Sequence, residues 1–392
     1  MSESIQPARN SPAERWLPPA PRSVVALPGR PVAEETSEFL TLVDRQLADV
    51  LDRLAEVWAA DDAQTVDQAQ TVDVLADRDL PELLGSLASA GKRIRPTMCY
   101  WGWLAAGGQD RDGSLSDVVR AGTALELLHV FALIHDDVMD ESASRRGQPS
   151  IHTLAAQLHL LSRARGSAQR FGESIAVLVG DLAHAEADHL VAGLPGPMRA
   201  IWRHLVIELV HGQSRDIIGS AAGRRDLSHA RRVARMKSGS YTIERPLQLG
   251  AAAAEASDAA VAALSAYGRQ LGEAFALRDD LLGVWGNPKV TGKPAGDDLI
   301  SGKPTVILAL SRGRLAGAAR EARERVGTPE FSTADVELLQ EELRACGVVD
   351  KVESLISSHV HAAVDALDPQ MLDPRGIAGL TQLAHRVAWR DR

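Results

Sequence analysis

The sequence lacks several features that define common classes of protein. Only two of its 392 residues are cysteine, so no disulfide framework can form, and we expect a cytoplasmic protein with reduced thiols. Its net charge of −9 supplies no basic footprint, which argues against nucleic acid as a partner. No run of 18 apolar residues is free of charge, since the best stretch, Ile175–Leu190, holds three acidic residues. We therefore expect no transmembrane segment.

Alternating strand patterns are also scarce, whereas residues that favour helices are abundant. Ala, Leu, Val, Arg and Glu dominate the chain after residue 37, and this composition predicts an all-α fold. Apolar residues recur at helical spacing near its start, at Val43, Leu47, Val50, Leu54 and Trp58. Ser332 with Asp335 is typical of a helix N-terminus, and Gly347 of a helix end. No break divides the chain into two cores, so we predict one all-α domain over residues 38–392.

The first 37 residues differ from the rest. Seven of the 19 prolines lie there, where they remove backbone donors and leave no apolar period. We predict a disordered tail over residues 1–37. Its apolar spots, such as Trp16 and Leu17, could dock a partner, although an inert tail is the simpler interpretation. Further on, the sequence AQTVD occurs at 63–67 and again at 69–73, and this acidic duplication predicts a surface loop.

Two pairs of aspartates, far apart in the sequence, are the first candidates for a functional site. Asp136 and Asp140 lie one helical turn apart and face the same way, with His129 two turns before Asp136. Stacked carboxylates repel unless a cation lies between them, and hard oxygen ligands suit Mg²⁺. Asp279 and Asp280 follow a second apolar segment and could approach from a facing helix. Taken singly, each pair is explained equally well as a solvated, charged helix end.

Clusters of cations accompany these aspartates. Arginine binds phosphate oxygens bidentately, while lysine supplies a compact charge. Each cluster alone is an ordinary basic surface, but with paired aspartates the clusters indicate a site that grips diphosphates between metal and cations. The clustered residues are Lys92, Arg93 and Arg95, then Arg145 and Arg146, then Lys237, and finally Lys293 and Lys303.

Taken in order, these motifs resemble those of the trans-isoprenyl diphosphate synthases, or polyprenyl synthetases, over roughly residues 83–305. The stretch from Arg278 to Leu299 is most similar to actinobacterial geranylgeranyl diphosphate synthases. The resemblance implies a single large helical bundle of the isoprenoid synthase type with a central cavity, assembled as a homodimer. The matching motifs are Gly91-Lys92-Arg93-x-Arg95-Pro96, Glu126-x-x-His129, Asp136–Asp140, Arg145-Arg146-Gly147, Gly180-Asp181, Gly212-Gln213-x-x-Asp216, Lys237-Ser238, Asp279-Asp280 and Gly292-Lys293-Pro294 with Gly302-Lys303.

The resemblance also implies a reaction, the condensation of isopentenyl diphosphate with an allylic diphosphate in a Mg²⁺-dependent, head-to-tail prenyl transfer. Asp136, Asp140 and Asp279 would bind Mg²⁺ and, with Lys237, form the catalytic set. Auxiliary acidic positions would be Asp137, Asp280 and Asp297. Isopentenyl diphosphate would be held by Lys92, Arg95, His129 and Arg146. The allylic diphosphate would be held by Arg145, Lys237 and Lys293, and Ser238 and Lys303 would also bind substrate.

Chain length in this family depends on a bulky residue beneath the first aspartates. Phe131 lies five residues before Asp136, roughly 7.5 Å along a helix, and its neighbour Ala132 is small. This combination favours a C20 product over C15. The sequence departs from the family pattern at Ala90, Ser238 and Gly283, where a glycine, a threonine and a third aspartate are usual, and at Ala276, where glutamine is usual.

Two other functions compete with an active synthase. A class I terpene cyclase shares the fold and the first aspartate motif, but its second motif is absent from this sequence. A non-catalytic or weakly catalytic subunit that binds prenyl diphosphates would account for Ala90 and Ala276, whereas the intact aspartates argue for catalysis.

Overall fold

The computed structural model describes residues 31–64, 74–76, 78–89, 91–110, 113–288 and 295–390. Over this part of the chain the regular structure is helical, except for one antiparallel hairpin of β1 (Ser144–Arg145) and β2 (Gln148–Pro149). The predicted all-α fold is therefore confirmed. The helices up to the middle of the chain are α1 (Val32–Gln64), α2 (Leu80–Ala88), α3 (Ile94–Ala105), α4 (Ser114–Met139), α5 (Ile151–Leu161), α6 (Ala168–Ala192) and α7 (Gly196–Ala221).

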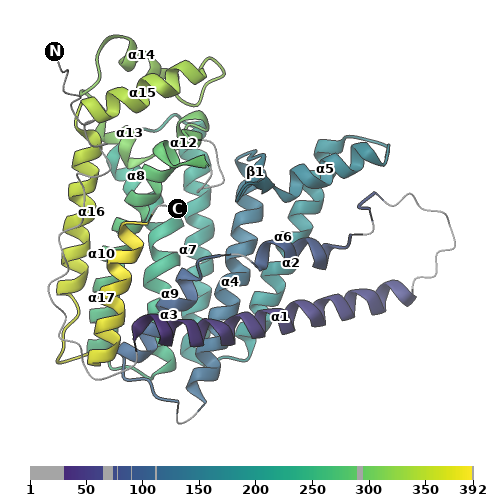
Figure 1. Ribbon diagram of the computed structural model, residues 1–392, viewed down its shortest axis with the longest axis vertical. Coiled ribbons are helices and arrows are strands. Elements are labelled where there is room, and N and C mark those ends of the chain that lie inside the picture. Colours follow the sequence, from purple (N-terminus) through teal and green to yellow (C-terminus); the bar gives the residue numbers. More distant parts are fainter. Residues whose placement is uncertain are drawn as a thin grey trace, which may run out of the picture.

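The second half of the chain continues with shorter helices around one long one, α10 (Asp258–Trp285). Before it come α8 (Leu227–Val233), the π-helix η2 (Ala234–Glu244) and α9 (Arg245–Ala253). After it come α12 (Asp297–Ile300), α13 (Val306–Leu310), α14 (Gly317–Arg325), α15 (Thr333–Ala345), α16 (Val348–Asp365) and α17 (Pro374–Ala388). Helices α4, α7 and α10 run alongside one another through the middle of the molecule, and α1 crosses them (Figure 1).

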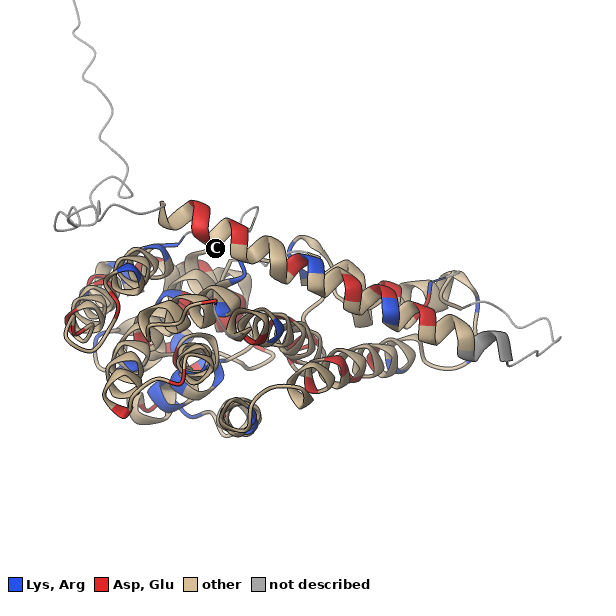
Figure 2. Ribbon diagram, turned by 90° about the horizontal axis from the view of Figure 1, so that it is seen from below, with Lys and Arg blue, Asp and Glu red and all other residues tan. Residues whose placement is uncertain are grey.

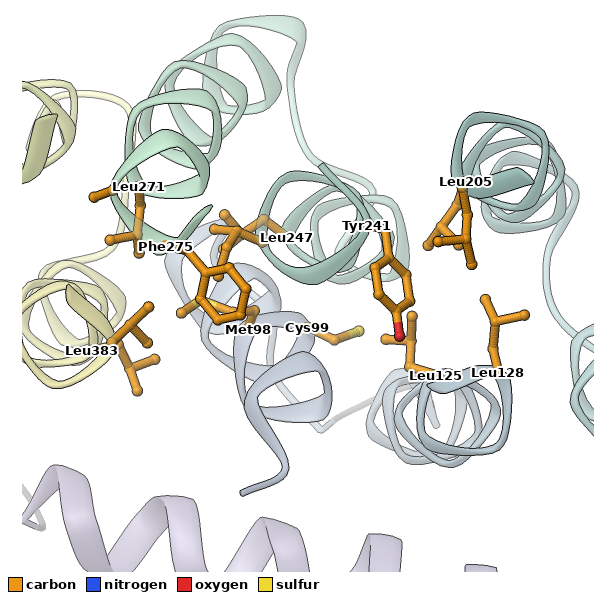
Figure 3. Close-up of a cluster of buried hydrophobic side chains, with 14 of the residues drawn as sticks. Met98, Cys99, Leu125, Leu128, Leu205, Tyr241, Leu247, Leu271, Phe275 and Leu383 are labelled. Atoms are coloured by element: carbon orange, nitrogen blue, oxygen red, sulfur yellow. The ribbon is translucent and has the colours of Figure 1, made fainter. Parts of the chain in front are cut away.

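Helix α4 forms the centre of the core, with α3, α6 and α9 packed around it. Leu125 and Leu128 on α4 meet Leu205 of α7 in the buried cluster shown in Figure 3. By length and composition, α4 is also the one described helix that could cross a membrane, but 61% of its apolar window is buried inside the protein. The sequence-based choice of Ile175–Leu190 as the most apolar stretch was therefore wrong, because α4 has the more apolar window. The apolar residues of α4 face neighbouring helices.

Helix α1 buries the residues that its spacing predicted. Val43, Leu47, Val50 and Leu54 pack into the core, while its charged residues lie along the exposed side (Figure 2). The helix begins at Val32, so the predicted tail boundary at residue 37 was wrong by one and a half turns.

Tertiary contacts explain this early start of α1. Glu35 accepts a hydrogen bond from the Tyr100 hydroxyl at 3.1 Å, and Thr36 accepts one from the Trp101 indole at 3.0 Å. Neither contact leaves a trace in the local sequence pattern. Residues 1–30, which carry the rest of the predicted tail, lie outside the described residues, as does the acidic duplication beyond the end of α1 at Gln64.

Glycines bring α3 and α9 into direct backbone contact. A Cβ atom at Gly250 would lie 2.0 Å from the Cys99 carbonyl oxygen, and one at Gly102 would lie 2.7 Å from the Leu247 carbonyl oxygen. Larger residues would push the helices apart. Because α9 follows η2 without a break, this close contact also sets the position of η2 against the beginning of α3.

Local signals were accurate at helix ends but missed the hairpin. Ser332 and Asp335 form the predicted capping box, and Gly347 adopts a φ of 75° after α15. The β1–β2 turn uses positive φ values at Arg146 and Gly147, as tight hairpin turns require. Two-residue strands contain too few residues to show an alternating pattern, so the sequence predicted only a break there.

Candidate active site

A cavity of about 1120 Å³ lies between α3, α4, α7, η2 and α10. We call the charged part of its lining, around Asp136, Lys237 and Lys303, the mouth; apolar side chains, among them Phe131, Leu209 and Phe275, line other parts of the cavity. Two of the predicted catalytic or substrate-binding residues do not line the cavity. Asp140 contacts the lining residue Lys303, and Lys293 lies outside the described residues. The predicted residues that line the cavity are Lys92, Arg95, His129, Phe131, Ala132, Asp136, Arg145, Arg146, Lys237, Ser238, Asp279, Asp280, Asp297 and Lys303.

Asp136 is held by two neighbouring helices. Lys237 of η2 contacts it at 2.8 Å and also contacts Asp216 of α7 at 2.7 Å. Gln213 of α7 donates a further hydrogen bond to Asp136 at 3.0 Å. Burial would raise the pKa of Asp136, but the charges of Lys237 and Lys303 outweigh it and hold the pKa below its ordinary value. Asp136 is therefore a carboxylate at neutral pH.

Asp140, at the end of α4, is held by the segment that follows α12. Lys303 contacts Asp140 at 2.8 Å and Asp298 at 3.6 Å. Burial by itself would lower the pKa of Lys303, yet Asp298, Asp136 and Asp140 raise it well above its usual value. The lysine is therefore a fixed positive charge that joins the first aspartate motif to the α12 segment.

Gly283 departs from the family pattern, and the structure supplies a reason. A Cβ atom at this position would lie 2.0 Å from the Asp298 carboxylate, so Asp298 occupies the space beside α10 that a side chain at 283 would need. The acidic group missing from α10 is thus replaced by one from α12. Ala276, the other notable departure, is buried on α10 and lacks the side-chain amide of the usual glutamine.

The two residues of the second aspartate pair have different surroundings. Asp279 forms an ion pair with Arg390, whose guanidinium also lies 4.0 Å from the centre of the Phe275 ring. Asp280 also lines the cavity and accepts a hydrogen bond from the Val306 amide at 2.8 Å. Burial and the nearby Asp298 raise the pKa of Asp280 well above its ordinary value. Neighbouring helix positions differ by about 100°, which separates the two carboxylates.

Arg390 reaches Asp279 because the end of α17 is fixed against α10. Arg278 donates to the Ala388 carbonyl at 2.6 Å and pairs with Glu353 of α16 at 2.7 Å. Sequence reasoning missed Arg390, which lies 111 residues from Asp279 and belongs to no motif.

The three predicted metal ligands do not converge in this structure. Among the described residues, no group of three or more His, Cys, Asp or Glu side chains is arranged to hold a metal ion. Instead, Asp136, Asp140 and Asp279 each pair with a cation. A donor set of separate carboxylates around a cavity still fits Mg²⁺, which usually takes one or two carboxylates and completes its shell with water and ligand phosphates.

The adjacent arginines of the hairpin have different roles. Arg145 forms a bidentate ion pair with Asp137, whose side chain is only 4% exposed, so part of its donor capacity is already used. Arg146 is exposed and donates to the Leu87 carbonyl at 3.2 Å. Asp137, predicted as an auxiliary ligand, instead anchors the hairpin to α4.

The opposite side of the mouth is basic. Arg95 lies over the ring of Tyr241, with its guanidinium carbon 4.1 Å from the ring centre, and His129 contacts the Tyr241 hydroxyl at 2.9 Å. Arg93, in the same run of cations, forms ion pairs with Glu126 at 2.7 Å and Asp44 at 2.9 Å. It therefore ties α1 and α4 together.

Aromatic and imidazole rings pack together where the apolar part of the cavity approaches α6. The Phe131 ring centre lies 4.5 Å from that of His135 and 4.8 Å from that of His184. His184 packs against Phe131 from α6. The bulky side chains near the first aspartates thus come from two helices, α4 and α6.

Long helices around a cavity with carboxylates and cations at its mouth and apolar walls below define the class of protein, a helical bundle of the isoprenoid synthase type. The family model for polyprenyl synthetase matches residues 78–343. The chain belongs to the polyprenyl synthetase family, and the predicted membership is confirmed.

Known relatives agree on this family and differ in product. The chain is 33% identical over 304 residues to geranylgeranyl diphosphate synthase of Mycobacterium tuberculosis, covering 76% of this chain and 80% of that protein. It is 30% identical over 305 residues to geranylfarnesyl diphosphate synthase of Aeropyrum pernix, covering 76% and 89%. A crystal structure of geranylgeranyl pyrophosphate synthase from Corynebacterium glutamicum, complexed with isoprenyl diphosphate and magnesium, superposes with a TM-score of 0.81 at 36% identity, covering 90% of this chain and 99% of that one.

The contrast between the hairpin arginines gives a stability prediction. Arg145→Met leaves Asp137 buried without its bidentate partner, so we expect a loss of about 3 kcal/mol in the free energy of unfolding. Arg146→Met removes an exposed side chain and should cost less than about 1 kcal/mol. Urea unfolding of the two variants tests this difference, and equal losses would contradict an anchoring role for Arg145.

Proposed function

We propose that the protein catalyses Mg²⁺-dependent head-to-tail condensation of isopentenyl diphosphate with an allylic diphosphate, and that its product is geranylgeranyl diphosphate. Membership of the family supports prenyl transfer. The observation that carries the rest is the charged mouth, where carboxylates of α4 and α10 face a basic wall above an apolar cavity. Two diphosphates would occupy the mouth, and the growing hydrocarbon chain would occupy the cavity below.

The basic residues divide into two sets around the mouth. Isopentenyl diphosphate would be held by Lys92 and Arg95 at the start of α3, His129 of α4 and Arg146 of the hairpin. The allylic diphosphate would be held by Lys237, Ser238 and Lys303. Arg145 would contribute the N–H donors that its ion pair with Asp137 does not use. Lys293, assigned to the same diphosphate by the family resemblance, stays a prediction, because it lies outside the described residues.

Asp136, Asp140 and Asp279 would hold Mg²⁺ together with oxygens of the allylic diphosphate. When bound, Mg²⁺ would neutralise negative charge on the diphosphate as it departs. The magnesium in the Corynebacterium glutamicum complex supports this assignment.

The chain's own groups would make the bond exchange possible. Lys237 and Lys303 are fixed positive charges at the mouth, placed to stabilise the oxygen that receives both electrons of the breaking C1–O bond. The apolar walls exclude water from the allylic cation. The double bond of isopentenyl diphosphate attacks C1, and a proton then leaves C2 of that unit to the departing diphosphate. Positioning and electrostatics suffice, so no protein nucleophile is required.

A C20 product is the chain length that Phe131 and Ala132 favour. Phe131 is braced by His135 and His184, so it forms a firm obstacle beneath Asp136, while Ala132 leaves room beside it. The geranylgeranyl synthase of Mycobacterium tuberculosis supports this length, whereas the geranylfarnesyl synthase of Aeropyrum pernix shows that other lengths occur among relatives of similar identity.

The homodimer implied by the family resemblance and the location expected from the two cysteines stay predictions. We expect a cytoplasmic homodimer. Apolar side chains that are exposed on α6 and α7 and do not line the cavity support an interface there, namely Val177, Leu178 and Ile207.

The direct test of the proposed reaction is incubation with Mg²⁺, labelled isopentenyl diphosphate and each allylic diphosphate in turn, followed by chromatography of the dephosphorylated products. We expect a C20 alcohol from the wild type. Asp136→Asn removes a carboxylate that faces the reacting diphosphate and should reduce kcat at least about 100-fold. If the wild type is inactive and the variant behaves identically, the chain is better explained as a non-catalytic subunit.

Product length tests the role of Phe131. Phe131→Ala removes the obstacle beneath Asp136 and should shift the products to chains longer than C20. Met139→Ala is the matched control, because Met139 lines the cavity between Asp136 and Asp140, above the obstacle, and is 50% exposed. Mass spectrometry of the products measures both, and an unchanged length distribution for Phe131→Ala would rule out this obstacle.

Arg390 should compete with the divalent cation for Asp279. In Arg390→Gln the carboxylate is released, and we expect Mn²⁺ to bind about two- to fivefold more tightly, since Asp279 is half-exposed and its pairing is modest. Arg386→Gln, on the exposed side of α17, should bind Mn²⁺ like the wild type. Titration of free Mn²⁺ by electron paramagnetic resonance measures binding without catalysis. Weaker binding by Arg390→Gln would show that Arg390 supports the site instead.

A further inference from the structure

Tyr241 contacts two of the side chains assigned above to isopentenyl diphosphate, and no motif found in the sequence includes it. The residue lies on η2, lines the cavity and is 4% exposed. Its ring projects from η2 toward α4, as Figure 3 shows. Both the ring and the hydroxyl are used.

The backbone of η2 holds Tyr241 rigidly. A Cβ atom at Gly239 would lie 2.8 Å from the Gly272 carbonyl oxygen of α10, and one at Gly212 of α7 would lie 2.7 Å from the Lys237 amide nitrogen. The π-helix is thus in close backbone contact with a long helix on each side. Its wide turns present Lys237, Tyr241 and Thr242 to the cavity, and π-helical turns are frequent at functional sites.

The ring of Tyr241 supports the guanidinium of Arg95. The guanidinium carbon lies 4.1 Å from the ring centre, and Nη2 donates to the Thr242 hydroxyl at 2.9 Å. Arg95 is only 8% exposed, so this cation–π contact is largely desolvated. Its Nε is buried and has no hydrogen-bond partner among the described residues, which leaves a donor unused beside the cavity.

The hydroxyl of Tyr241 determines which nitrogen of His129 carries the proton. The hydroxyl and His129 Nδ1 are 2.9 Å apart, and the hydroxyl oxygen also accepts from Arg95, which leaves its proton free to point at His129. Burial lowers the pKa of His129 well below its ordinary value, and the charges of Arg95 and Arg146 lower it further, so the imidazole is neutral. Burial raises the pKa of Tyr241, so the phenol keeps its proton.

A neutral imidazole next to a protonated phenol has two arrangements. If the phenol donates to Nδ1, the proton of the imidazole lies on Nε2, and every polar group of the pair is satisfied or faces the cavity. If Nδ1 donates instead, the phenol proton lacks an acceptor and Nε2 presents a lone pair to any anion in the cavity. Burial penalises the unsatisfied donor, so the first arrangement is favoured.

We propose that Tyr241 is a positioning residue for isopentenyl diphosphate, which holds the Arg95 guanidinium on its ring and fixes His129 in the Nε2–H form that donates to a diphosphate oxygen. This inference rests on the proposed function for the identity of the ligand. Tyr241 would thus be an uncharged member of the isopentenyl diphosphate subsite. Its effect is to keep a cation and a neutral donor aimed at the same anion.

The kinetic test separates the two diphosphates. Tyr241→Phe keeps the ring beneath Arg95 and removes only the hydroxyl, so we expect the KM for isopentenyl diphosphate to rise about tenfold. The KM for the allylic diphosphate and kcat should change by less than about twofold. Tyr267→Phe is the matched control, because Tyr267 is fully buried and donates to the Leu380 carbonyl at 2.7 Å, away from the cavity. It should leave both KM values unchanged.

A spectroscopic test requires no turnover. ¹⁵N spectra of histidine-labelled protein, with the His129 signals identified by comparison with His129→Gln, should show Nε2 protonated in the wild type and a mixture of tautomers in Tyr241→Phe. A wild-type proton on Nδ1, or an unchanged KM for isopentenyl diphosphate in Tyr241→Phe, would overturn the proposal. A wild type that forms no prenyl diphosphate would instead refute the proposed function, while the ¹⁵N spectra still decide the tautomer.

Discussion

The pairing of carboxylates with cations from other helices is the interaction on which the site depends. Asp136 and Asp140 are stacked on one helix near a low-dielectric interior, where like charges repel strongly. Lys237 and Lys303 relieve that repulsion, and each lysine also contacts a second carboxylate, Asp216 or Asp298. Because an unpaired buried charge is very costly, these contacts tie α4, α7, η2 and the α12 segment together at the mouth of the cavity.

The same pairing makes the mouth ready for ligands that carry opposite charges. A diphosphate needs cations and a divalent metal needs carboxylates, and both are already present in balanced amounts. Binding then exchanges one set of partners for another without leaving either kind of charge unpaired. Arg390 extends this arrangement to Asp279, so the end of the chain takes part in the charge balance of the second acidic pair.

Below the mouth, close packing controls the space available to a hydrocarbon chain. Gly102 and Gly250 let α3 and α9 touch, which fixes η2 and therefore Tyr241 at the wall of the cavity. Phe131 is enclosed by His135 and His184 from two helices. The volume beneath the aspartates is thus set by helix-to-helix distances as well as by the size of one residue.

Much of this protein could be predicted from the sequence by itself, because the relevant signals are local. Helical spacing located α1, the capping residues located the start of α15, and the four-residue spacing of Asp136 and Asp140 placed them on one face. The family motifs identified most of the charged residues that line the cavity. Contacts across the fold were decided only by the tertiary structure. Arg390 reaches Asp279 over 111 residues, Tyr241 reaches His129 over 112, and Asp298 fills the space beside Gly283. Such partners leave no local pattern, since the distance between two side chains depends on how whole helices pack and not on the residues beside them.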